Sequence, residues 1–266
     1  MQDEEWLVDG PRTIDLEDVT SLKVGLIGGQ VDVVAHDEPG ARIEVHSVSG
    51  RPLRIAVKAG RLEVDHPQLR WDDWIATMRA FDSKARADVS LLVPRAIAVK
   101  LGVVSASALV SGVTGAVTLS TVSGDLVADR IVGDLQLNSV SGELSVRDHE
   151  GAIASHTVSG GLTVSGAITD FSSDGVSAPV FLEVSGAPRA IVVNTVSGSV
   201  TARLDPDIRV EYTITTASGR LQLDDITERH VRGRWTGVGG PEDGRRVPLR
   251  VGSVSGNVNV VHAVRA

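Results

Sequence analysis

The chain has 266 residues, a formal net charge of −8 and no cysteine, which excludes disulfides and thiolate metal sites. Its lysines and arginines are scattered, which argues against nucleic-acid binding and against a polybasic membrane patch. Hydrophobic residues make up 42% of the chain but aromatic residues only 3%, a composition that favours a long, thin core of β-branched and small side chains.

The start of the chain shows no targeting segment. Residues 1–5 (MQDEE) are acidic and lack an apolar run, so we expect no signal peptide. No run of about 18 apolar residues follows that could span a membrane. From these two observations we expect a cytoplasmic protein.

Residues 1–66 predict strands of irregular phase. Apolar residues alternate with polar ones in Gly29–Val33, Ala41–Val45, Leu53–Val57 and Leu62–Val64. We expect this region to form irregular first rungs or an N-terminal cap.

Residues 67–87 contain the one predicted helix, near 68–86, or else a loop insertion. Trp71, Trp74 and Met78 fall at helical spacing, with Phe81 at the next turn. One interpretation is an apolar stripe that covers one end of the fold. The other is that these four residues form an exposed docking surface for a protein partner or lipid.

A strand over Asp88–Val93, stopped by Pro94, and another from Ile97 lead into a repeat. Glycine recurs every nine residues, at Gly115, Gly124, Gly133, Gly142, Gly151 and Gly160. A Thr/Ser-Val-Ser-Gly motif recurs at twice that spacing, at 121–124, 139–142 and 157–160, and residues 175–178 keep this frame with alanine in place of glycine. Copies at 195–198, 216–219 and 253–256 follow at looser spacing. We expect bulges and loops to account for the looser spacing.

The repeat predicts stacking of equivalent segments. After each glycine the sequence alternates with period two, which indicates short strands with one buried face, joined at glycine corners. If the coils stack in phase, the motif valines from Val122 onward form a buried aliphatic column, and the serines from Ser123 onward form an external hydroxyl ladder. The predicted fold is therefore an all-β parallel β-helix (β-solenoid) of about 18 residues per coil, and we expect it to be right-handed.

The whole chain, 1–266, is expected to be a single solenoid domain, with regular rungs over 88–266. About five coils are expected over 106–200. Residues 228–247, which include the run GVGGPEDG, are expected to be a mobile loop inserted before the last copy of the motif.

The sequence resembles the bacterial putative-adhesin family of DUF4097 type, also described as the Toastrack domain. The resemblance lies in Val89–Pro94, in the successive Thr/Ser-Val-Ser-Gly-x-Leu units up to Gly198, in the unit at Gly256, and in the opening Leu26–Val33. It covers most of the chain. It implies a single-handed β-helix without known catalytic residues, in a family often linked with cell-envelope stress proteins.

No pattern for catalysis or metal binding is complete. Asp125, Asp134 and Glu143 follow successive glycines, but Ala152 and Gly161 then take the same slot, which breaks a calcium β-roll pattern. Asp125 and Glu143 share a phase and could be neighbouring carboxylates of a glycan enzyme, although a solvated polar ladder is the simpler explanation. The seven histidines, of which His149 and His156 are the closest to a pair, show no zinc-ligand spacing.

We therefore expect no enzyme, no cofactor and no metal. The first hypothesis is a noncatalytic scaffold that presents a flat, repetitive surface to a protein partner, in a membrane-associated complex of the cell envelope. The second is a self-assembling scaffold, a homo-oligomer whose ends stack head to tail. The third is a carbohydrate-binding or glycan-active β-helix.

Overall fold

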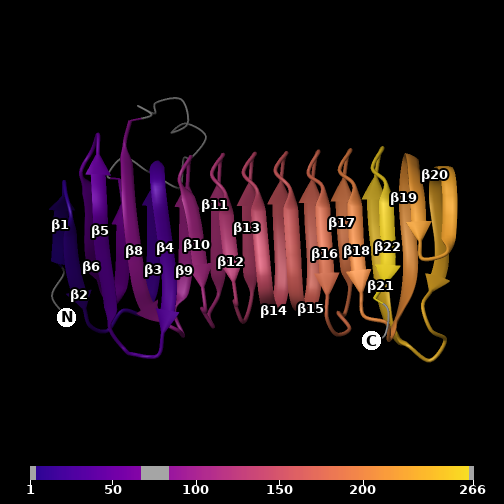
Figure 1. The fold of residues 1–266 in the computed structure, drawn as a ribbon, viewed down its shortest axis with the longest axis horizontal. Coiled ribbons are helices and arrows are strands. Elements are labelled where there is room, and N and C mark those ends of the chain that lie inside the picture. Colours follow the sequence, from indigo (N-terminus) through magenta and orange to yellow (C-terminus); the bar gives the residue numbers. More distant parts are fainter. Residues whose placement is uncertain (1–3, 67–83, 264–266) are drawn as a thin grey trace. The chain divides into compact units, whose positions relative to one another are not determined.

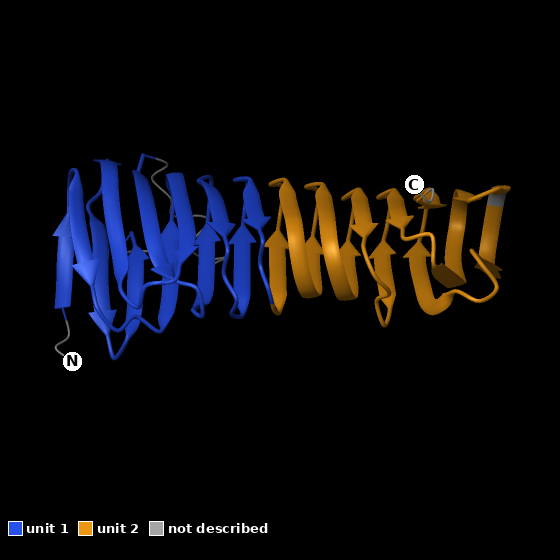
Figure 2. Ribbon diagram, turned by 60° about the horizontal axis from the view of Figure 1, so that its bottom comes forward, with its two compact units in different colours: residues 1–132 blue, residues 133–266 orange. Residues whose placement is uncertain are grey.

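The computed structural model describes residues 4–66 and 84–263, and all secondary structure in this part of the chain is β. The chain divides into two compact units, residues 1–132 and 133–266 (Figure 2). The described residues contain no helix. Most of the segment predicted as helix lies outside them, and its end is wrong: residue 84 is in a turn and Arg86 already begins a strand.

Unit 1 contains the first twelve strands (Figure 1). They are β1 (Glu4–Val8), β2 (Arg12–Leu16), β3 (Ser21–Leu26), β4 (Gly28–His36), β5 (Ala41–Ser49), β6 (Leu53–Lys58), β7 (Arg61–Asp65), β8 (Arg86–Pro94), β9 (Ala98–Val103), β10 (Ser107–Ser111), β11 (Val117–Thr121) and β12 (Leu126–Asp129).

Two sheets run through unit 1. One has the order β1-β6-β7-β3-β9-β11 and the other β2-β5-β8-β4-β10-β12. The pairs of β1 with β6, β6 with β7, β2 with β5 and β5 with β8 are antiparallel, and the remaining pairs are parallel. The N-terminal region is thus an antiparallel cap followed by parallel rungs, so both interpretations of residues 1–66 apply to part of it.

Unit 2 contains the other ten strands. They are β13 (Leu135–Ser139), β14 (Leu144–Thr157), β15 (Leu162–Gly175), β16 (Val180–Val184), β17 (Ile191–Thr195), β18 (Val200–Leu204), β19 (Ile208–Leu223), β20 (Ile226–Gly239), β21 (Arg245–Ser253) and β22 (Val258–His262). Several of these, such as β14 and β19, are much longer than the four- or five-residue strands that the glycine spacing predicts.

The predicted 18-residue coil is confirmed in both units. In unit 1, Val117 lies beside Val99, 18 residues earlier. In unit 2, Leu162 lies beside Leu144 at the same interval, and both pairs are parallel. The buried faces carry mainly Val, Leu, Ile and Ala, with Phe171 and Tyr212 as the largest fully buried side chains of the described residues. The right-handed sense of the coil stays a prediction.

The spatial order of the last coils differs from their order in the sequence. β21 pairs in parallel with β17 on one side and with β19 on the other, and β22 pairs with both β18 and β19. The coil made by β21 and β22 therefore lies between the coil of β17 and β18 and the strand β19. The long interval before the last motif copy comes from the β19–β20 hairpin, which is made before the chain returns as β21. The extra two residues before the copy at 195–198 lie in the connection between β16 and β17, as the prediction of loops within rungs requires.

The loop expected over 228–247 is also wrong. β20 occupies most of it and pairs antiparallel with β19 from Val210 to Leu223. Only a short turn before Arg245 separates it from β21. The hairpin forms because a strand next to β19 satisfies backbone groups that would otherwise be exposed at the end of the stack.

The predicted buried column of motif valines is wrong. Val158, Val176, Val196 and Val254 are 46, 47, 46 and 51% exposed. In the copies that begin with Thr or Ser, the inward residue is the hydroxyl residue before the valine; the copy at 175–178 begins with Gly175 instead. In the first copy, Gly124 N–H donates to Thr121 Oγ1 at 2.8 Å and Thr121 Oγ1 donates to Gly124 O at 2.7 Å. This Thr/Ser-turn closes the corner with the local hydroxyl, and the valine points out.

The serines of the motif lie outside, as expected, but Ser123, Ser159 and Ser177 bond to backbone oxygens and not to one another. Ser159 Oγ donates to the backbone oxygen of Val140, one coil earlier, at 3.0 Å. Ser177 Oγ donates in the same way to Val158 O at 3.3 Å. Ser123, Ser159 and Ser177 therefore tie their corners to the backbone of the preceding corner.

Candidate functional site

A row of equivalent positions, all but one of them occupied by polar residues, lies on the outer face of one sheet in unit 2. Its members occupy equivalent positions in parallel neighbouring strands and each stands directly before a copy of the motif. In spatial order this polar column comprises Asn138, His156, Asp174, Asn194, Gly252 and Thr215.

One hydrogen bond and one longer polar contact link the middle of the polar column. Asn194 Nδ2 donates to Asp174 Oδ1 at 2.9 Å, and His156 Nε2 lies 3.7 Å from Asp174 Oδ2. This last pair attracts only when the imidazole is protonated, and weakly, because both side chains are 56% exposed. The hydrogen bond from Asn194 Nδ2 to Asp174 orients the Asn194 amide. The Asn194 Oδ1 atom is therefore directed toward the neighbouring strand β21.

Gly252 leaves a gap in the column. A Cβ atom at this position would lie 2.8 Å from Asn194 Oδ1, closer than such contacts normally come. Because glycine has no side chain, Asn194 Oδ1 can lean over the backbone of β21. On the other side of the gap, Thr215 of β19 presents an exposed side chain.

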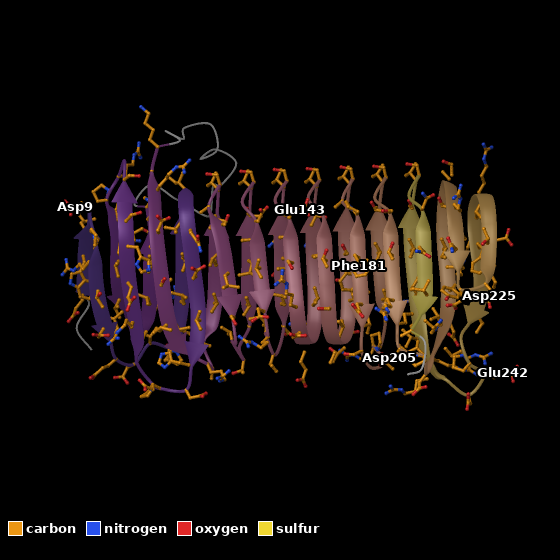
Figure 3. All side chains as sticks on the ribbon, viewed as in Figure 1. Asp9, Glu143, Phe181, Asp205, Asp225 and Glu242 are labelled. Atoms are coloured by element: carbon orange, nitrogen blue, oxygen red, sulfur yellow. The ribbon has the colours of Figure 1, made fainter. Side chains whose placement is uncertain are left out.

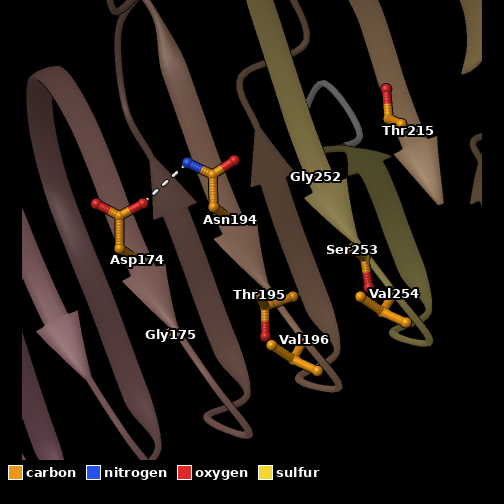
Figure 4. Close-up of a pocket in the computed structure, with 9 residues that line it drawn as sticks. All are labelled: Asp174, Gly175, Asn194, Thr195, Val196, Thr215, Gly252, Ser253 and Val254. Carbon is orange, nitrogen blue, oxygen red and sulfur yellow. Dashed lines mark hydrogen bonds between the residues drawn. The ribbon is translucent and has the colours of Figure 1, made fainter.

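The gap opens into a hollow of about 400 Å³ (Figure 4). One part of its wall is polar and the other is made by the exposed valines of two motif copies. The lining residues are Asp174, Gly175, Asn194, Thr195, Val196, Thr215, Gly252, Ser253 and Val254.

The backbone of the hollow is held by the corners described above. Gly198 N–H donates to Thr195 Oγ1 at 2.9 Å, and Gly256 N–H donates to Ser253 Oγ at 2.7 Å. These bonds use the hydroxyls of Thr195 and Ser253 and turn Val196 and Val254 outward. The hollow is consequently amphipathic and its walls are ordered by the fold itself.

Of the residues singled out in the sequence, His156 belongs to the polar column. Trp71, Trp74, Met78 and Phe81 are outside the described residues. Asp125 is an exposed residue of unit 1, directly before β12.

In unit 2, Asp134 and Glu143 are exposed and stand directly before β13 and β14. The first halves of these strands belong to opposite sheets, so the structure does not bring Asp134 and Glu143 into one site. His149 is buried at 1% exposure whereas His156 is exposed in the polar column, so these two do not form a ligand pair. The described residues contain no group of three or more His, Asp or Glu side chains that could hold a metal ion.

The sequence did contain a signal for the polar column. Its members are the residues immediately before Ser139, Thr157, Gly175, Thr195, Thr216 and Ser253, the first residues of the motif copies. Aligning the copies and reading that one position would have collected them. The order in which they stand in space, with Gly252 between Asn194 and Thr215, could not be obtained in this way.

Comparison with known proteins supplies the family. The family model described as Toastrack DUF4097 matches residues 19–261. No curated protein matches the chain. The described residues contain no helix with the length and apolar character needed to cross a bilayer.

Three solved structures are similar to the chain at low sequence identity. A putative adhesin from Bacteroides fragilis NCTC 9343 has 10% identity and a TM-score of 0.41, with 94% of this chain and 97% of that chain covered. A putative lipid binding protein from Parabacteroides distasonis ATCC 8503 has 11% identity and a TM-score of 0.47, with 96% and 97% covered.

The third is a putative cell adhesion protein from Clostridium sporogenes ATCC 15579, with 10% identity, a TM-score of 0.29, and 95% and 100% covered. These scores are too low to carry an argument about function, so the assignment depends on the family model, which spans most of the chain. With its parallel β-coils and this match, the chain belongs to the Toastrack DUF4097 family.

Proposed function

We propose that this protein is a noncatalytic, adhesin-like binding module and that the hollow beside Gly252 is its attachment site. The observation that carries the proposal is the gap in the polar column between Asn194 and Thr215, with the apolar wall of Val196 and Val254 beneath it. Concave sites with a few fixed polar groups and an apolar wall are typical of ligand binding.

The chemistry of the hollow favours binding over turnover. Asp174 is the one ionisable residue in its lining, and its carboxylate already accepts a hydrogen bond from Asn194. Hydrolysis of a glycosidic bond in most enzymes uses two carboxylates on either side of the bond. A single carboxylate held by a neighbouring amide is better suited to orienting a bound group than to proton transfer.

Several finer predictions belong to the same proposal. Family membership supports a link with the cell envelope. A protein partner in a membrane-associated complex, bound through a surface other than the hollow, stays a prediction. The docking surface of Trp71, Trp74, Met78 and Phe81 and the self-assembling scaffold both stay predictions. A homo-oligomer would be detected as light scattering that rises with protein concentration.

The test is surface binding by the full chain and by Gly252→Ile. The β-branched side chain is compatible with strand β21 and fills the hollow, since its first atom already meets Asn194 Oδ1. Labelled protein is titrated onto purified cell envelopes, peptidoglycan and immobilised extracellular-matrix proteins. We expect saturable binding to at least one of these surfaces, weakened by about tenfold or more in Gly252→Ile.

Gly10→Ile is the matched control, because a Cβ at Gly10 meets no atom within 4 Å. It adds the same apolar side chain in unit 1, outside the lining of the hollow, and should bind like the wild type. Equal binding by wild type and Gly252→Ile would place the attachment site elsewhere. Absence of saturable binding to every surface would end the proposal of an adhesin-like module.

A further inference from the structure

We propose that the ligand of the hollow is a neutral glycan; the inference rests on the proposed function and specifies its ligand class. The hollow brings together an amide oxygen, a carboxylate and a hydroxyl, from Asn194, Asp174 and Thr215. Sugar hydroxyls donate and accept hydrogen bonds at once, and therefore match such a mixed set. The aliphatic side chains below offer contact to the C–H face of a sugar ring.

The charge of the lining argues against ionic ligands. Asp174 is its only charged group, so an anion such as a uronic acid or a phosphate beside Asp174 would be repelled at short range; the exposed Arg234, the register partner of Thr215, lies outside the lining. A divalent cation would need several acidic or carbonyl oxygens, and the described residues hold no cluster of three acidic or imidazole groups. A neutral polyol is not repelled by Asp174 and does not need a cluster of acidic oxygens.

The backbone around the hollow argues against a peptide. An extended peptide usually binds by adding a strand to an open sheet edge. Here β17 pairs with β15 and β21, and β21 pairs with β17 and β19, so no strand edge opens into the hollow. Recognition must come from side chains, which favours a ligand rich in its own hydroxyl groups.

The polar column gives a glycan chain a track to follow. Neighbouring strands are about 4.8 Å apart, and successive polar column residues are one strand apart. From the hollow, the column continues through Asp174 to His156, both exposed. A linear oligosaccharide that starts in the hollow would thus meet one further polar side chain at each step.

The opposite sheet of unit 2 contains the strongest rival site for a sugar. Phe181 of β16 is 41% exposed and lies between Thr163 and Thr201 of the neighbouring strands (Figure 3). An exposed aromatic ring is a common platform for sugars, but the lining of the hollow does not include Phe181. The experiment must therefore distinguish the two faces.

The experiment titrates the full chain with oligosaccharides by isothermal calorimetry. The probes are neutral cello-, manno- and chito-hexaoses, with an oligogalacturonate as the anionic counterpart and an unstructured Ser/Thr-rich peptide. We expect binding of at least one neutral oligosaccharide, and none of the oligogalacturonate or the peptide.

Four variants locate the site. Gly252→Ile should weaken neutral glycan binding by at least about tenfold, and Thr215→Val, which removes one hydroxyl at nearly constant shape, by about three- to tenfold. Thr201→Val, its counterpart on the other sheet, and Phe181→Ala should bind like the wild type. Thermal unfolding of each variant verifies that the fold is retained.

The outcomes separate this inference from the proposed function. Tighter binding of the anionic oligosaccharide or the peptide overturns it, as does loss of glycan binding in Phe181→Ala but not in Gly252→Ile. If no oligosaccharide binds while surface binding remains sensitive to Gly252→Ile, the ligand class is wrong and the attachment site stands. If no oligosaccharide binds and surface binding is also unchanged in Gly252→Ile, both the ligand class and the attachment site are wrong.

Discussion

The substitution Thr121→Val decides which residue of the motif stabilises the corner. Thr121 is 4% exposed and its hydroxyl both accepts from Gly124 N–H and donates to Gly124 O. Valine keeps the shape but leaves a buried N–H and a carbonyl of the turn without this partner. A buried donor that loses its acceptor costs about 1–3 kcal/mol, so we expect unfolding to be easier by about 2 kcal/mol.

The assay is urea unfolding followed by circular dichroism, with the slope m compared between variants. Val122→Thr, in the same motif copy, serves as the control. Val122 is partly exposed, so its exchange for an isosteric hydroxyl residue should change the free energy of unfolding by less than about 0.5 kcal/mol. Amide exchange at Gly124 should also become faster in Thr121→Val alone.

A buried valine column predicts the reverse ranking. In that arrangement Val122→Thr would place a hydroxyl in an apolar interior and be the costly change, whereas Thr121→Val would be nearly neutral. Thr121→Val with wild-type stability and wild-type exchange at Gly124 would therefore refute the stabilising role of the motif hydroxyl.

Three further predictions concern a close approach and two buried ionisable groups. Gly124→Ala should prevent correct stacking of neighbouring coils, because its Cβ would overlap Ala106 O. Gly10→Ala is the control and should unfold like the wild type, as measured by thermal unfolding of both variants. Burial raises the pKa of Tyr212, so native stability should fall as pH rises above the ordinary value of 10.0. As Tyr212 is the only tyrosine, tyrosinate absorbance should appear only on unfolding, and titration in the native state near pH 10.0 would contradict this. Burial lowers the pKa of His66, so stability should fall as pH drops below 6.5, and less so in His66→Gln, as measured by urea unfolding at a series of pH values.

The sequence predicted the coil because its signals are local and repeated. Period-two alternation marks the buried face of a strand, and the interval of 18 residues appears as pairs such as Leu144 with Leu162. The nine-residue glycine spacing also has a structural basis at both corners. Gly124 accommodates a close backbone approach, whereas Gly133 has a positive φ of 121°.

The predicted side-chain directions were wrong at the motif corners, where the period-two alternation stops. Inside a strand, side chains point to opposite faces in turn, but a turn resets this order. At the motif corner, the hydroxyl of Thr121 bonds to Gly124 and points inward, and the valine that looks more apolar is turned outward. Hydropathy alone could not assign these directions, since they follow from the turn hydrogen bonds.

The candidate site likewise combines features that follow from the local sequence with features that only the tertiary structure determines. The motif copies determine that Asn194, Thr215 and Gly252 hold equivalent positions, because each stands directly before a copy. The sequence thus determined the coil length, the alternating burial within strands and the positions of the corners, all of which follow from local patterns that repeat along the chain.

Only the tertiary structure decided which coils are neighbours. Gly252 lies beside Asn194 and Thr215, 58 and 37 residues away in the chain, because the hairpin of β19 and β20 is made before the chain returns as β21. Parallel strands gain similar hydrogen bonds from any partner of matching pattern. Local sequence therefore leaves the choice among such partners open, and the packing of the whole unit makes it.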